Sequence, residues 1–66
     1  MQVTVNGERR EMAEDLTILQ LLSQVSLANR RVAVEINREL VTRSLHETRK
    51  INPGDVIEIV SLVGGG

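Results

Sequence analysis

Only one stretch of this chain has the periodicity of an amphipathic helix, and that stretch constrains the fold more than any other feature. The apolar positions that recur at the spacing of one helical face are Ile18, Leu21, Leu22 and Val25. Thr17 can cap the first turn, and Gln20, three residues later, can complete a capping box. Because a single helix with one apolar face needs a second layer to bury that face, we expect the helix to pack on a sheet.

The remainder of the chain carries strand patterns separated by turns. Residues 1–5 alternate apolar and polar, and the following Asn6-Gly7 is a strong hairpin signal, so residues 8–12 are expected to run back as a second strand. Residues 32–36 alternate in the same way. A short strand at 40–41 is expected after a polar turn over residues 37–39.

The C-terminal third is expected to hold an irregular segment, a turn and a last strand. Residues 42–50 lack a clear period and are expected to contain at most one helical turn. Pro53 and Gly54 suit the two central positions of a type II turn. The final strand is predicted from Val56 to about Leu62.

This order of elements predicts the α+β class. One main helix would pack on one face of a mixed sheet of four to five strands, and the last strand would return to pair beside the first. That is the ubiquitin-like β-grasp arrangement. We expect residues 1–62 to form this domain and residues 63–66 to form a flexible C-terminal glycine tail.

Composition excludes several classes of function. The chain has no cysteine, so it offers no thiolate, and no aromatic residue, so it has no platform for stacking nucleobases. Its net charge of −1, with acidic and basic residues interleaved, gives no field for nucleic acid. No apolar run approaches the length of a membrane span. We therefore expect a soluble, cytoplasmic protein that is a monomer when free.

The residues with the most specific functional signal are Val63, Gly64, Gly65 and Gly66. Glycines without Cβ atoms can thread a narrow channel and present a terminal carboxylate to another protein's active site. The competing interpretation is a frayed end or a passive linker.

Several segments resemble the sulfur carrier proteins of the thiamine pathway, the ThiS family. They are Val32-Ala33-Val34-Glu35-Ile36-Asn37, Leu40-Val41, Arg43-Ser44, His46, Pro53-Gly54-Asp55, Ile57-Glu58-Ile59-Val60 and Val63-Gly64-Gly65-Gly66. The resemblance also covers the length of the chain and its Asn6-Gly7 hairpin. The family often has Pro where Thr42 stands and Asp where Pro53 stands, and these departures concern local turns.

The resemblance implies a carrier without a catalytic residue, metal site or bound cofactor of its own. A ubiquitin-activating-like enzyme would use ATP and Mg to adenylate the carboxylate of Gly66. A sulfur donor such as a cysteine desulfurase would then convert Gly66 to a thiocarboxylate, and thiazole synthase would receive the sulfur. Val63, Gly64 and Gly65 would occupy the partner's channel.

Partner docking is expected on the last strand. If Ile57 and Ile59 face the helix, alternation places Val60 and Leu62 on the opposite face, where an exposed apolar pair beside the tail would mark a contact site.

Three alternatives remain open: the small subunit of molybdopterin synthase, a protein modifier that ends in an amide bond, and a β-grasp binding module with a passive tail.

Other polar residues are interpreted as structural or solvated. Ser44, His46 and Asp55 lack the spacing that would indicate a catalytic triad, and a lone histidine in a polar loop is more often structural. The pairs Arg9-Arg10 and Arg30-Arg31 are expected on solvated faces, where either could steer an acidic partner.

Overall fold

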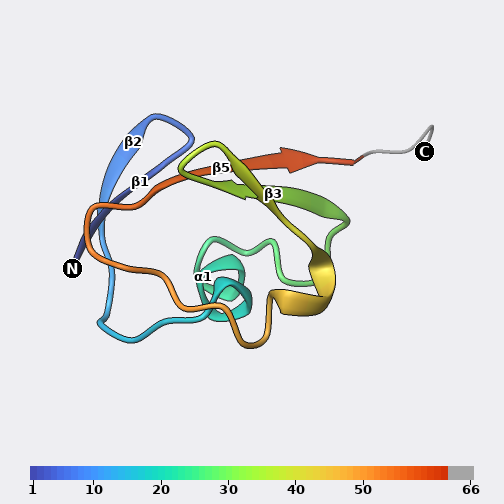
Figure 1. The fold of residues 1–66 in the computed structure, drawn as a ribbon, viewed down its shortest axis with the longest axis horizontal. Coiled ribbons are helices and arrows are strands. Elements are labelled where there is room, and N and C mark those ends of the chain that lie inside the picture. The colour runs from blue at the N-terminus through green and yellow to red at the C-terminus, as the bar shows by residue number, and fades with distance from the viewer. Residues whose placement is uncertain (63–66) are drawn as a thin grey trace.

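The computed structural model describes residues 1–62. Along the chain lie β1 (Gln2–Val5), β2 (Glu8–Glu11), α1 (Ile18–Gln24), β3 (Val32–Ile36), β4 (Glu39–Val41), a 3-10 turn η1 (Arg43–Leu45) and β5 (Val56–Ser61). Figure 1 shows the strands above α1, with the segment between η1 and β5 passing beneath the sheet.

The five strands form one mixed sheet in the order β2-β1-β5-β3-β4. β1 pairs with β5 in parallel, and the other neighbours are antiparallel. The last strand has therefore returned to the centre of the sheet beside the first, and α1 covers one face (Figure 1). The predicted β-grasp fold is confirmed.

Two tight turns join the antiparallel pairs at the edges of the sheet. Asn6 and Gly7 have φ of 49° and 83°, as a two-residue hairpin turn with positive φ at both positions requires. Asn37 and Arg38 adopt the same arrangement, with φ of 51° and 72°. The second turn is one residue shorter than the sequence predicted, so Glu39 belongs to β4.

The capping box at the start of α1 is present. The backbone N–H of Gln20 donates to Thr17 Oγ1 at 3.2 Å, and the N–H of Thr17 donates to Gln20 Oε1 at 2.9 Å. The first helical N–H groups, which lack partners within a helix, find them in the loop after η1. Ile18 N donates to Arg49 O and Leu19 N donates to His46 O. The irregular segment thus anchors the helix to the rest of the domain.

The core between the sheet and α1 is entirely aliphatic apart from one methionine. Its buried members are Val3, Val5, Met12, Leu16, Ile18, Leu21, Leu22, Val34, Ile36, Val41, Ile51, Ile57 and Ile59. β2 contributes none, because all four of its residues are exposed. Its charged sequence suits an edge strand, since charges discourage pairing with other chains. Across residues 1–62, no helix has the length and apolar character that crossing a membrane would need.

Candidate functional site

The end of β5 presents apolar side chains on the open face of the sheet. Ile57 and Ile59 point into the core and are buried. Val60 and Leu62 alternate with them and are 57% and 51% exposed. The predicted facing of the last strand is confirmed, while the docking role of Val60 and Leu62 stays a prediction.

Neighbouring strands extend this apolar surface. Ala33 on β3 is the register partner of Val60. Leu40 on β4, which is 66% exposed, lines a shallow hollow together with Ala33 and Leu62. We name Val60, Leu62, Ala33 and Leu40 the exit patch. Contiguous exposed apolar surface of this kind marks contact sites on otherwise polar proteins.

Two glutamates face each other beside the exit patch. Glu35 of β3 and Glu58 of β5 are register partners on the open face, and both are exposed. Like charges directly opposite each other on adjacent strands are unfavourable, so a cationic group of a partner would relieve the repulsion. The sequence contains both residues, but only the register between the strands brings them together.

The backbone of β5 is held on the β3 side up to its end. Ser61 pairs with Val32, and the N–H of Leu62 donates to Arg31 O at 2.8 Å. Leu62 is the last residue that the structure describes, and the predicted tail residues Val63, Gly64, Gly65 and Gly66 lie outside the described residues. The central strand β5 therefore ends at an exposed apolar surface.

Ser44, His46 and Asp55 do not form a catalytic triad, as the sequence predicted. Ser44 bonds with Thr42, and the buried His46 bonds through Nε2 to Val41 O at 3.2 Å. The buried Asp55 accepts hydrogen bonds from the backbone N–H of Asn52 and from Asn37 Nδ2. Each group is engaged with a different neighbour, so the structural interpretation of His46 is confirmed.

The arginine pairs lie at the surface, as the sequence predicted. Within residues 1–62, no three side chains of the kinds that bind metals lie close enough together to hold an ion. The described part of the chain thus presents an exposed apolar surface at the end of β5, where the sequence predicts partner docking.

Comparison with known proteins agrees with this description. The model of the ThiS family matches residues 3–66. The chain is 38% identical over 63 residues to the sulfur carrier protein ThiS of Bacillus subtilis, covering 94% of this chain and 96% of that protein. The crystal structure of the thiamine biosynthesis protein ThiS from Geobacter metallireducens superposes with a TM-score of 0.86 at 35% identity, and the match covers 100% of both chains.

A third relative has a different size. The thiazole synthase of Paramagnetospirillum magneticum is 39% identical over 66 residues, which are 100% of this chain but only 20% of that protein. In such relatives, a segment similar to this chain forms one part of a longer polypeptide that is named thiazole synthase.

These matches decide between the alternatives that the residues left open. They favour the thiamine-pathway carrier over the molybdopterin synthase subunit and over a passive binding module. The chain belongs to the ThiS family: it is a sulfur carrier of thiamine biosynthesis and not a catalyst.

Proposed function

We propose that this chain carries sulfur as a thiocarboxylate on Gly66 and gives it to thiazole synthase for the thiazole ring of thiamine. The observation that carries the proposal is the position of Leu62, which follows β5 at an exposed apolar surface and directly precedes Val63, Gly64, Gly65 and Gly66 in the sequence. Membership of the ThiS family supports the same chemistry.

Activation must come from a partner enzyme. A carboxylate is a poor electrophile, so its oxygen first attacks the α-phosphorus of ATP, which releases pyrophosphate and leaves an acyl-adenylate. Mg²⁺ and cationic side chains of the enzyme would stabilise the phosphate charge. This chain would bind neither ATP nor the metal itself, and a ubiquitin-activating-like enzyme would hold both.

Sulfur enters by displacement of AMP. The terminal sulfur of a persulfide, formed on a donor such as a cysteine desulfurase, attacks the acyl carbon and AMP leaves. A thiol then cleaves the resulting acyl disulfide, which frees the thiocarboxylate and leaves a new disulfide on the donor. Because the carrier has no cysteine, no internal thiol competes for the activated acyl group.

The tail has the reach for this chemistry. At about 3.3 Å per extended residue, Val63 to Gly66 would span roughly 13 Å beyond the sheet. The exit patch, together with Glu35 and Glu58, would dock on the adenylating enzyme while the tail enters its channel. A partner surface with an apolar centre and a basic rim would complement both features.

The test is intact mass spectrometry of the protein ending at Gly66. We expect incubation with the adenylating enzyme, ATP, Mg²⁺, a cysteine desulfurase and a thiol to produce a mass shift for one sulfur replacing one oxygen. Fragmentation should place that shift on Gly66.

The matched control is a variant that lacks Gly65 and Gly66 and retains the whole described domain. It should fold normally and acquire no sulfur, because the reacting position has moved. If the full chain stays unmodified, or if the truncated chain is modified equally well, the proposal is wrong. A conjugate through an amide bond would instead indicate a protein modifier.

A further inference from the structure

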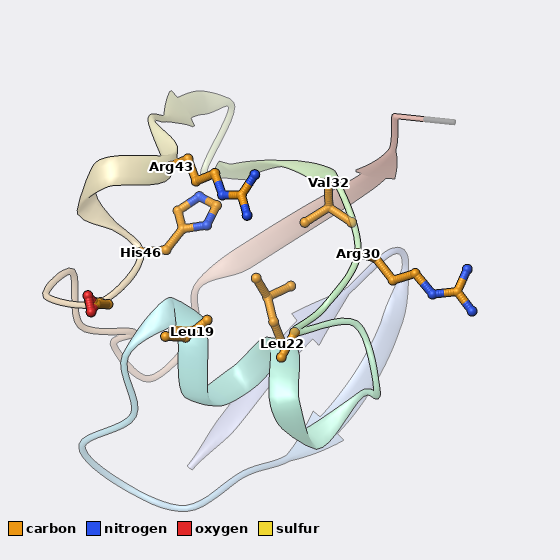
Figure 2. Close-up of a pocket in the computed structure, with 8 residues that line it drawn as sticks. Leu19, Leu22, Arg30, Val32, Arg43 and His46 are labelled. Carbon is orange, nitrogen blue, oxygen red and sulfur yellow. The ribbon is translucent and has the colours of Figure 1, made fainter. Parts of the chain in front are cut away.

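A second surface feature lies on the helix side of the sheet, at the same end as Leu62. It is a pocket of about 230 Å³ between α1, β3 and the η1 segment. Leu19, Leu22 and Val32 supply its apolar walls, and Arg43 and His46 point into it side by side (Figure 2). Roughly 300–1,000 Å³ is usual for small-molecule sites, so this pocket has the size for one or two side chains of a protein.

The pocket continues around the edge of the sheet to the exit patch. A neighbouring hollow shares Val32, Arg43 and His46 with it and extends to Leu40 and Leu62. We name the two together the edge groove. A partner that binds the tail residues after Leu62 would therefore also lie next to the edge groove.

Positive charge is concentrated around the edge groove. Arg30, Arg31 and Arg43 line it, and Glu47 is its one acidic residue among those described, although the chain as a whole carries a net charge of −1. The ion pairs found within residues 1–62 involve other cationic groups: the N-terminus, Arg10 and Lys50. The three arginines are thus available to an acidic partner.

His46 adds a directed hydrogen-bonding atom. Since a carbonyl oxygen only accepts, the Nε2–H of His46 must donate to Val41 O, and Nδ1 of the neutral ring is then an acceptor. Nδ1 makes no hydrogen bond within residues 1–62, yet every fully buried polar side-chain atom described there has a partner. Nδ1 must therefore be reachable from the edge groove, although the residue is only 6% exposed.

We propose that the edge groove binds an extended acidic segment of thiazole synthase. An aliphatic side chain of that segment would lie against Leu19, Leu22 and Val32. A neighbouring Asp or Glu carboxylate would pair with Arg43, and a backbone N–H would donate to His46 Nδ1.

The assignment to thiazole synthase rests on the proposed function and on the fused relatives, in which both parts share one polypeptide. The exit patch lies on the open face of the sheet and the pocket beside α1 lies on the helix side, and the hollow lined by Ala33, Leu40 and Leu62 joins them. A carrier that visits two enzymes can therefore present Val60 to one and the pocket beside α1 to the other, with Ala33, Leu40 and Leu62 common to both.

The experiment compares two charge reversals in the full chain, loaded as the thiocarboxylate. Arg43→Glu should raise the Kd for purified thiazole synthase about tenfold at low salt, because a rim charge then repels the acidic segment. The difference should shrink as added salt screens the contact. Arg38→Glu is the control, since Arg38 is also exposed but lies in the β3–β4 turn at the opposite end of β3. It should leave the Kd within about twofold.

A second measurement observes His46 directly without replacing a buried residue. In ¹⁵N-labelled wild-type protein, adding thiazole synthase should shift the Nδ1 resonance of His46 more than adding the adenylating enzyme does, because only thiazole synthase would donate a hydrogen bond to Nδ1. Arg43→Glu should still acquire sulfur at the wild-type rate, because Arg43 does not belong to the exit patch on which we propose that the adenylating enzyme docks.

The outcomes separate the two proposals. If the wild type is loaded and binds thiazole synthase, but Arg43→Glu binds equally well, the edge groove is not the docking site. If Arg43→Glu weakens binding to the adenylating enzyme instead, the occupant is wrong. If the wild type is never loaded, the proposed function itself fails, and so does the inference that rests on it.

Discussion

The side chain of Asn6 pairs with both backbone groups of Ile59. Asn6 Oδ1 accepts from the N–H of Ile59 at 2.7 Å, and Asn6 Nδ2 donates to the carbonyl oxygen of Ile59 at 3.2 Å. β1 pairs with β5 only as far as Val5 opposite Ile57, and the chain then turns away. The side-chain amide therefore occupies the place of the next peptide group and extends the ladder toward Leu62.

Replacing Asn6 should destabilise the domain through these bonds. We expect Asn6→Gly to lower the free energy of unfolding by about 1–2 kcal/mol, since glycine tolerates the φ of 49° but makes neither bond. Asn6→Ala should cost about 1 kcal/mol more, because alanine is strained in the left-handed region. Urea denaturation measures both, and unchanged protection of the Ile59 amide in hydrogen exchange of Asn6→Gly would contradict the role.

A buried carboxylate supports the loop that leads into β5. Asp55 is 7% exposed and accepts from Asn52 N at 2.8 Å and from Asn37 Nδ2 at 3.0 Å. Asp55→Ala should lower stability by about 2–3 kcal/mol, because two part-buried donors lose their carboxylate acceptor. Glu8→Ala, which removes an exposed contact to Arg10, should cost less than about 1 kcal/mol. Equal losses in thermal denaturation would refute this ranking.

The two faces of β5 should respond differently to truncation. Ile57→Ala removes a side chain with 0% exposure and should cost about 2–5 kcal/mol, which is a large part of the stability of so small a domain. Val60→Ala on the open face should change stability by less than about 0.5 kcal/mol. Chemical denaturation of the pair measures the contrast. A comparable loss at Val60 would mean that the open face is part of the folding core.

Local sequence signals predicted most of the fold. The capping box at Thr17 and Gln20 and the turn at Asn6-Gly7 depend on interactions between residues close in the sequence. They can therefore be recognised from the sequence without knowledge of tertiary contacts. The alternation at Ile57 and Ile59 indicated which face of β5 is buried. The return of the last strand beside the first followed from the need to cover one helix with one sheet.

Features that depend on register could not be predicted in the same way. Glu35 meets Glu58 because of how β3 and β5 align, and 22 intervening residues separate the two in the sequence. His46 lies in a polar stretch, and its burial arises only when Val41 and α1 close over it. The sequence predicted that Leu40 lies in a short strand. Its position in the exit patch could not be predicted, because it depends on the place of β4 at the edge of the sheet. The tail, by contrast, was predicted from its composition alone and lies outside the described residues.

A charge placed in the exit patch should impair activation without unfolding the protein. Val60→Asp is expected to raise the KM for the adenylating enzyme about tenfold, because an apolar contact becomes a buried charge in the complex. Val56→Asp, on the same face at the far end of β5 and 44% exposed, is the control and should leave the KM nearly unchanged. Pyrophosphate release measures both. A similar rise in KM for the two variants would indicate a general charge effect rather than a local contact.

Two glycines should separate the function of the tail from the stability of the fold. Gly65→Val adds a branched side chain where we propose that a narrow channel encloses the tail, and displacement of the reacting carbonyl should slow sulfur loading about 100-fold. Stability should not change, because the buried core residues of the described domain lie between Val3 and Ile59. Gly54→Ala should do the reverse: at φ of 84° it should cost about 1 kcal/mol in unfolding free energy while loading proceeds normally. Intact mass spectrometry over time and urea denaturation, applied to both variants, measure the two effects. Loading of Gly65→Val at the wild-type rate would show that the channel tolerates a side chain at this position. A requirement for glycine could then hold only at Gly66.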